Sequence, residues 1–212
     1  MNKCPLCGNQ TTICDSDKQR QYMLCSECGL IHVPERFHLD AESQKARYDL
    51  HKNSSDDSGY ISYLSVITSQ VSNMIKKGAK GLDYGSGPTP VMSDMLKICG
   101  YCINQYDLFY ANDQQVLNDT YDFVVSSETV EHILDARYVW ELFEKLVPSG
   151  HIFIMTQMYD DPKTIGRWHY ANDSTHVTFY CRRTFKKIAK DHDFRIEHID
   201  NKTMVFRNCY EE

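Results

Sequence analysis

The sequence lacks any long apolar run. No stretch approaches the roughly 18 apolar residues that a membrane-spanning helix needs, and the start, MNKCPLCG, has no apolar segment of the kind found in secretory signals. Runs of positive charge are also missing, since no run of Lys and Arg exceeds two residues and Asp and Glu outnumber them by 29 to 23. These absences argue against a membrane partner and against broad contact with nucleic acid backbones. We expect a globular, cytoplasmic protein.

The cysteines are plentiful and unevenly placed. In a reducing compartment, paired thiols bind metal more often than they form disulfides. Four of them make two CxxC pairs: Cys4, Cys7, Cys25 and Cys28. Each pair is followed by a glycine, Gly8 or Gly29, which can adopt the turn that wraps a sulfur ligand. The spacing predicts structural zinc held by four thiolates in a ribbon over residues 1–32, with a redox pair or free thiols as the alternative.

The remainder of the chain divides into a polar segment, residues 33–56, which we interpret as a linker or cap, and a main domain, residues 57–212. Apolar periodicity predicts a helix near residues 60–74 and then alternating strands and helices. The expected strands cover residues 80–84, 101–107, 121–127 and 151–157, and the expected helices cover residues 90–100, 135–147 and 182–194. This order predicts an α/β fold with a doubly wound, mostly parallel sheet whose ligands lie at the carboxyl ends of the strands. Residues 195–208 should close it as an antiparallel hairpin.

One repeat of this alternation is absent. The segment between Asp107 and Tyr121 is long enough for one crossover of about a dozen residues, but a helix, a strand and a second helix would need about twice that. We predict that the usual third strand and its helix are missing or vestigial.

The loop after the first strand, Asp83 to Pro90 (DYGSGPTP), has two glycines but lacks the third glycine of a GxGxxG motif. Pro90 stands where a complete GxGxxG would have its third glycine, and Pro88 removes another backbone donor. A pyrophosphate needs converging N–H groups, so a nicotinamide dehydrogenase is the least favoured reading. Gly85 and Gly87 still allow close backbone approach, and the Asp83 carboxylate suits an ammonium group.

A second carboxylate ends the next strand. Asp107 follows Gly87 by about twenty residues, the position at which an acidic residue can accept the hydroxyls of a ribose. A nucleoside joined to an amino acid meets both requirements. That molecule is S-adenosylmethionine.

Three stretches, GLDYGSGPTP, YDFVVSSETVEHI and LVPSGHIFIMTQ, resemble the successive motifs of class I S-adenosylmethionine-dependent methyltransferases over roughly residues 57–210. RYDLHKN and WHYANDSTHVTFY resemble one bacterial branch of that family, which often carries a zinc ribbon in front. The resemblance implies a Rossmann-like methyltransferase fold, with Leu108 and Phe109 as candidates for apolar contact to adenine. It implies these cofactor-binding residues: Asp83, Tyr84, Gly85, Ser86, Gly87, Asp107, Leu108, Ser127 and Glu128.

Methyl transfer requires a positioned acceptor, exclusion of water and, for a hydroxyl or amine, removal of a proton. Histidine suits the last role because its ordinary pKa, about 6.5, lies near working pH. The stretch WHYANDSTHV follows a strand and should overhang the cofactor edge. His176 is the preferred base, with His169 and Asp173 as alternatives, and a histidine that only holds the loop in place is the structural interpretation. Trp168, Tyr170 and Tyr180 are expected to form pocket walls or core.

The cluster SSETVEH follows the strand at residues 121–127. If a helix starts here, Glu128, Glu131 and His132 share one face. With His176 they could hold magnesium or manganese. The order resembles the metal site of 2'-O-methyltransferases that act on the ends of small RNAs, and of certain quinone O-methyltransferases. A metal-free polar pocket and a purely structural helix start remain the alternatives.

In the linker, the resemblance suggests that Arg47, Tyr48, His51 and Asn53 cap the cofactor site, and a solvated helix is the alternative. We therefore expect a methyltransferase that acts on a small-molecule or carrier-bound acceptor at O, N or C. An RNA methyltransferase whose ribbon binds RNA is the second hypothesis, disfavoured by acidity. A non-catalytic cofactor-binding adaptor is the third.

Overall fold

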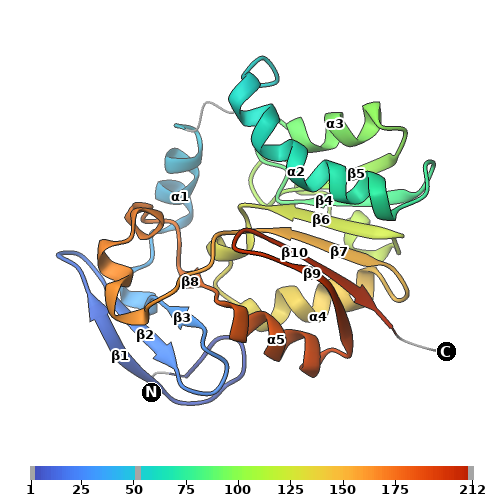
Figure 1. Ribbon diagram of the computed structural model, residues 1–212. Helices are drawn as coiled ribbons and strands as arrows, with labels where there is room; N and C mark the ends of the chain where they lie inside the picture. The colour runs from blue at the N-terminus through green and yellow to red at the C-terminus, as the bar shows by residue number, and fades with distance from the viewer. Residues whose placement is uncertain (1–2, 51–53, 210–212) are drawn as a thin grey trace.

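The computed structural model describes residues 3–50 and 54–209 and contains two β-sheets (Figure 1). The larger sheet has the order β5-β4-β6-β7-β10-β9. Its strands are β4 (Lys80–Tyr84), β5 (Cys102–Tyr106), β6 (Phe123–Ser127), β7 (His151–Met155), β9 (Phe194–Ile199) and β10 (Thr203–Asn208). The first four run parallel, and β10 is antiparallel to both β7 and β9. The predicted doubly wound sheet with a C-terminal hairpin is confirmed.

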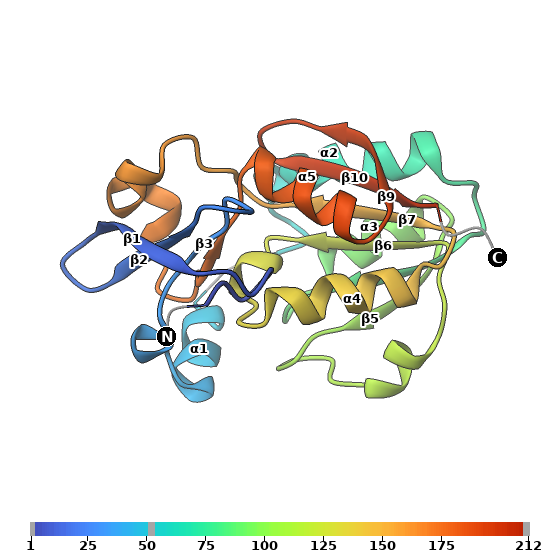
Figure 2. The same ribbon diagram turned by 90° about the horizontal axis from the view of Figure 1, so that it is seen from below.

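Helices cover both faces of this sheet (Figure 2). On one face lie α2 (Ser58–Met74) and α3 (Val91–Ile98), and on the other lie α4 (Ala136–Leu146) and α5 (Arg182–Asp191). Within β6, Phe123 and Val125 pack with the α2 and α3 side, whereas Val124 packs with Trp140 and Phe143 of α4. A strand buried on both faces needs a continuous apolar run, which is why the residues from Phe123 to Val125 are apolar without alternation.

The predicted loss of the third strand is also confirmed. After β5, the chain makes a single bridge between Asp107 and Ala111 and one 3-10 turn, η2 (Gln114–Asn118), before it reaches β6. Strand β5 is therefore at the edge of the described sheet. The carboxyl ends of β5, β4 and β6 are left with short connections, which form the floor of the candidate site.

The smaller sheet joins the ribbon to the main domain, which the sequence did not predict. Its order is β1 (Thr11–Ser16), β2 (Gln21–Cys25), β3 (Ile31–His32) and β8 (Thr178–Phe179). Three strands come from the ribbon and the fourth comes from the main domain. Ile31 pairs with Phe179, and the Val33 N–H donates to the Val177 carbonyl over 2.8 Å. The ribbon is thus built into the main domain.

Part of the segment that we interpreted as a linker is helical. A 3-10 turn, η1 (Glu35–Phe37), precedes α1 (Ala41–Tyr48), whose first turn is capped by Asp40 accepting from the Ser43 N–H over 2.8 Å. Three further 3-10 turns, η3 (Val130–His132), η4 (Pro162–Arg167) and η5 (His169–Asn172), lie close to the site. Among the described residues, no helix is both long and apolar enough to cross a membrane.

Candidate active site

The four ribbon cysteines converge. Their sulfur atoms lie within 4.8 Å of one another, with Cys4 and Cys28 3.6 Å apart and Cys7 and Cys25 3.4 Å apart. A tetrahedral zinc ion with bonds of about 2.3 Å would hold its sulfurs about 3.8 Å apart. The glycines after the two pairs both have positive φ, +75° at Gly8 and +77° at Gly29, as the knuckle interpretation requires. The cluster fits zinc.

The glycine loop follows β4. Gly85 has φ +85°, and a Cβ built on it would lie 2.8 Å from the Cβ of Thr129, so the loop packs directly on the middle of the SSETVEH cluster. Gly87 has φ +68°, but a Cβ built there would meet nothing within 4 Å. The space above Gly87 is therefore open to a ligand. The buried Ser86 hydroxyl has no hydrogen-bond partner among the described residues, which is also expected of a loop that holds a bound molecule.

Asp107 lies beside this open space. Its Oδ2 accepts from the Gly87 N–H over 2.9 Å, and its Oδ1 accepts from the N–H groups of Phe109 and Tyr110 over 2.9 and 3.1 Å. A carboxylate offers about four acceptor positions. Asp107 thus organises the loop and keeps acceptor capacity for a ribose hydroxyl.

Two other expected cofactor residues lie deeper. Asp83 is 2% exposed and accepts from the Ser93 hydroxyl of α3 over 2.7 Å, and burial raises its pKa to about 6. The ring of Tyr84 is stacked on Tyr106, with centroids 5.2 Å apart, and meets Phe143 edge-on. Tyr84 therefore belongs to the core, and only its backbone borders the loop.

Leu108 and Phe109, the two residues expected to contact adenine, lie in different surroundings. Leu108 is 59% exposed. Phe109 instead packs against Tyr48 of α1, with ring centroids 5.7 Å apart, and Tyr48 also meets His132 edge-on at 5.2 Å. Helix α1 therefore reaches across from the glycine-loop side to the SSETVEH cluster. His51 and Asn53, the other expected cap residues, lie outside the described residues.

The cluster at the end of β6 contains a pair of carboxylates, of which Glu131 is buried and Glu128 is half-buried. Glu128 Oε1 accepts from the Tyr63 hydroxyl of α2 over 2.6 Å, and Oε2 accepts from the Tyr170 hydroxyl over 3.0 Å. Tyr170 also hydrogen-bonds Glu131 Oε1. Burial, reinforced by the charge of Glu128, raises the pKa of Glu131 to about 8, and burial also raises that of Glu128. The second oxygen of Glu131 is buried and has no partner among the described residues.

The local backbone explains how these side chains converge. The helix considered for this stretch is only the single 3-10 turn η3, and α4 does not start until Ala136. Glu128 lies before that turn with φ +48°, a conformation that residues with side chains rarely adopt. Its N–H donates to the Met155 carbonyl of β7 over 2.7 Å, while the neighbouring Ser127 hydroxyl contacts the Met155 sulfur at 3.4 Å.

Two histidines face Glu131. One nitrogen each of His132 and His176 and one Glu131 oxygen lie within 4.8 Å of one another. The centroids of the two imidazole rings are 4.6 Å apart. His132 Nδ1 lies 3.2 Å from the Thr175 carbonyl, and His176 Nδ1 lies 2.7 Å from the Tyr170 carbonyl. A carbonyl only accepts, so Nδ1 carries the proton in both rings, and a neutral ring then presents its Nε2 lone pair. This is the tautomer of many metal-bound histidines.

The other expected groups in this segment have supporting positions. His169 is exposed and packs beside Trp168. Asp173 accepts from the Thr175 N–H and hydroxyl over 2.9 and 2.7 Å, and its Oδ2 lies 3.4 Å from Arg47 of α1. Although burial opposes it, these bonds from Thr175 lower the pKa of Asp173. Asp173 shapes the turn that leads to His176.

Sequence reasoning missed Tyr63 and treated Tyr170 only as a pocket wall or core residue. Both donate hydroxyl hydrogen bonds to Glu128. The available signal for Tyr63 was its place one helical turn after Tyr60 on α2. No local pattern distinguishes such a tyrosine from one that only fills the core.

The sequence profile of a methyltransferase-domain family matches residues 59–199. Among curated proteins, none matches this sequence.

Several solved structures share the fold. The Burkholderia thailandensis 1,6-didemethyltoxoflavin-N1-methyltransferase, solved with S-adenosylhomocysteine, is 14% identical, with a TM-score of 0.53 over 94% of this chain and 99% of that chain. A candidate S-adenosylmethionine-dependent methyltransferase of Methanococcus maripaludis is 15% identical, with a TM-score of 0.54 over 84% and 96% of the chains. Magnesium protoporphyrin IX methyltransferase of Synechocystis PCC 6803, solved with S-adenosylhomocysteine, is 14% identical, with a TM-score of 0.50 over 81% and 94% of the chains.

At these identities the structural likeness establishes the fold, and the profile match over most of the chain establishes the family. The chain belongs to the methyltransferase-domain family, and the predicted resemblance to class I S-adenosylmethionine-dependent methyltransferases is confirmed.

Proposed function

We propose that the protein transfers the methyl group of S-adenosylmethionine to an oxygen, nitrogen or carbon atom of a small-molecule or carrier-bound acceptor. The observation that carries this proposal is the contact of the glycine loop with the buried carboxylate cluster, through Thr129 against Gly85. It brings a cofactor loop and a site rich in proton acceptors together at the carboxyl ends of β4 and β6. Two of the solved relatives, both of which bind S-adenosylhomocysteine, act on small heterocyclic or tetrapyrrole compounds by their names.

The cofactor would lie over Gly87, where the loop is open. Asp107 would bind a ribose hydroxyl while it holds the Gly87 N–H. Because Asp83 is buried against Ser93, we propose that it supports the loop and attracts the methionine ammonium group by its charge instead of by direct contact. The Ser86 hydroxyl and the Ser127 side chain are further candidates for polar contact to the cofactor, while Leu108 supplies an exposed apolar surface.

The acceptor would face Glu128, Tyr170 and His176. Tyr63 and Tyr170 fix the orientation of the Glu128 carboxylate, and His176 is held in the tautomer whose Nε2 can accept a proton. An acceptor hydroxyl or amine that binds there would lose its proton to this group of side chains as the methyl group arrives. His169, being exposed, is the weaker candidate for that role.

We further propose that Glu131, His132 and His176 can hold a divalent cation. The buried oxygen of Glu131 without a partner among the described residues and the two histidine tautomers fit such an ion. Glu128 would complete the site. Bound there, a cation would lower the pKa of an acceptor hydroxyl. The metal-free alternative leaves His176 as the proton acceptor.

The experiment that tests the function is incubation of the purified protein with methyl-labelled cofactor and a fractionated cell lysate. Label in the small-molecule or carrier-protein fraction supports the proposal. Label confined to RNA would instead support the RNA methyltransferase. No label in any fraction, together with retained binding of S-adenosylhomocysteine, would favour the non-catalytic adaptor.

A further inference from the structure

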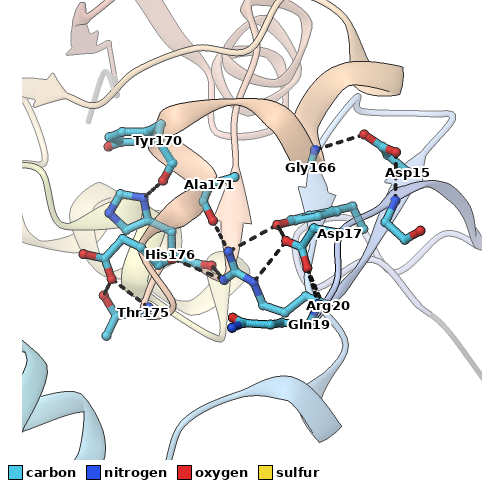
Figure 3. A network of polar contacts seen from close by, with 12 residues as sticks. Asp15, Asp17, Gln19, Arg20, Gly166, Tyr170, Ala171, Thr175 and His176 are labelled. Carbon is cyan, nitrogen blue, oxygen red and sulfur yellow. Dashed lines mark hydrogen bonds and ion pairs between the residues drawn. The ribbon is translucent and has the colours of Figure 1, made fainter.

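An arginine of the ribbon is buried in the main domain. Arg20 lies in the turn between β1 and β2, and its side chain is only 6% exposed. Arginine is rarely buried without a set of acceptors. Figure 3 shows the guanidinium group reaching from the ribbon toward the segment between Tyr170 and His176.

The acceptors are main-chain carbonyl oxygens of that segment. Arg20 Nη1 donates to the carbonyls of Asp173 and His176 over 3.2 and 3.0 Å, and Nη2 donates to the carbonyl of Ala171. A planar guanidinium is a rigid fork of donors that can satisfy several such oxygens at once. Residues 171–176 therefore form a concave turn of carbonyls around one cation.

The opposite side of the same turn carries the functional side chains. Tyr170 hydrogen-bonds the carboxylates of Glu128 and Glu131, while the His176 ring packs on Tyr170 at 4.2 Å and on His132 at 4.6 Å. The carbonyls that accept from Arg20 belong to Ala171, Asp173 and His176, so the guanidinium contacts the main chain directly after Tyr170 and at His176 itself.

Arg20 is itself fixed by the ribbon. Asp17 accepts from the N–H groups of Gln19 and Arg20, each over 2.7 Å, and from the Tyr22 hydroxyl. Tyr22 in turn accepts from Arg20 Nη2 over 3.2 Å. Tyr22 is in β2, the strand that ends at Cys25, one of the four clustered cysteines. A bound zinc ion would stabilise β2, the strand that begins directly after Arg20.

A second connection reinforces the first. The N–H of Val33, which directly follows the ribbon strand β3, donates to the Val177 carbonyl over 2.8 Å, and the Val177 N–H donates to the Glu131 carbonyl over 2.9 Å. The residue that follows His176 thus lies between the ribbon and the buried carboxylate.

We infer that Arg20 is a positioning residue, through which the metal-binding ribbon holds the Tyr170–His176 turn in its working geometry. The ribbon would then act as a brace of the active site. This inference rests on the proposed function only in that the turn carries Tyr170 and His176.

The test is hydrogen exchange of the full-length, zinc-loaded protein, resolved to the peptide that covers residues 171–177. In Arg20→Ala, we expect exchange in this peptide to accelerate by about tenfold or more, because hydrogen bonds from a charged donor are lost. Arg20→Lys should fall between that variant and the original protein, since lysine can reach fewer of the carbonyls. Millimolar guanidinium should restore protection in Arg20→Ala.

Arg183→Ala is the matched control. Arg183 also joins the main domain to the ribbon, donating to the carbonyls of Cys25 and Ser26 over 3.2 and 2.8 Å. It does not hydrogen-bond residues 171–177 among the contacts described. We expect its removal to leave exchange there unchanged. The cobalt–thiolate absorption of cobalt-loaded protein should be the same in Arg20→Ala as in the original, showing an intact ribbon.

Unchanged exchange of residues 171–177 in Arg20→Ala, or equal acceleration in Arg183→Ala, would overturn the inference. A cobalt–thiolate band lost in Arg20→Ala, with no protection restored by guanidinium, would also overturn it, because the effect would then be collapse of the ribbon. Binding of S-adenosylhomocysteine is measured on the same samples. Its absence in the original protein would refute the proposed function without affecting the contrast in exchange.

Discussion

We predict that replacement by alanine destabilises the protein more at Gly85 than at Gly87, the two glycines of the cofactor loop. At Gly85, an added Cβ would lie 2.8 Å from Thr129 Cβ and closer still to the two outer atoms of that side chain. At Gly87 it would meet nothing within 4 Å. Both residues have left-handed φ, +85° and +68°. The backbone penalty is therefore common to both, and the steric penalty belongs to Gly85 alone.

The magnitudes follow from these contacts. The left-handed conformation costs alanine about 1–2 kcal/mol, so Gly87→Ala should destabilise the protein by about that amount. Gly85→Ala adds overpacking against Thr129, about 1–3 kcal/mol more. Urea unfolding followed by circular dichroism should resolve this difference. Changing Thr129 to Ala in the Gly85→Ala background should recover part of the added loss, because the close outer atoms are removed.

Ligand binding adds a second readout for Gly87→Ala. If the cofactor fills the open space above Gly87, a methyl group there should weaken S-adenosylhomocysteine binding by about tenfold or more, which corresponds to about 1.4 kcal/mol. Equal stability of the two variants would refute the contact between the loop and Thr129. Unchanged affinity in Gly87→Ala would refute the placement of the cofactor.

Three further predictions concern the carboxylates of Asp107, Glu131 and Asp200. Asp107→Ala should weaken S-adenosylhomocysteine binding about 10- to 100-fold, from the loss of charged hydrogen bonds, and calorimetry showing full affinity would exclude its ribose role. Mn²⁺ should bind the zinc-loaded protein and bind much less to Glu131→Gln, and equal binding by both, or by neither, would defeat the second metal site. Burial opposes ionisation of Asp200, but backbone bonds from Lys202 and Thr203 lower its pKa to about 2. It therefore stabilises the folded chain above its ordinary pKa of about 3.9, and the contribution fades as pH falls toward 2. Asp200→Asn should accordingly be less stable by about 1 kcal/mol near neutral pH and lose that deficit in acid, whereas a deficit independent of pH would contradict the assignment.

Sequence reasoning reached the sheet because its strands are short apolar runs separated by strong helix signals. The order of elements, the C-terminal hairpin and the missing third strand all followed from local pattern and chain length. The position of the glycine loop also followed from the local sequence. Gly85 and Gly87 have a positive φ, which glycine adopts far more readily than other residues.

What the sequence did not indicate are the contacts between distant segments. Strand β8 has only two residues and pairs with β3, which lies far away in the chain, so no periodicity reports it. Arg20 looks like a solvated charge in a turn until the carbonyls around it are known. Glu128 has a positive φ and contacts Met155 of β7 and Tyr63 of α2, and the stretch for which a helix start was one alternative instead brings two carboxylates together.

These tertiary contacts also change the interpretation of individual residues. Tyr84, expected at the cofactor, has its ring in the core, stacked on Tyr106 and edge-on to Phe143. Tyr170, expected as a wall, connects two carboxylates. For both tyrosines the residue type alone did not indicate the role, because the role depends on the residues that the side chain contacts.

We propose that the open space over Gly87 and Asp107 binds a nucleoside joined to an amino acid. Titration of the zinc-loaded protein with S-adenosylhomocysteine in a calorimeter tests it most directly. We expect saturable binding of one ligand per chain, weakened about 10- to 100-fold in Asp107→Ala. Absence of any binding by the original protein, for S-adenosylhomocysteine and S-adenosylmethionine alike, would contradict it.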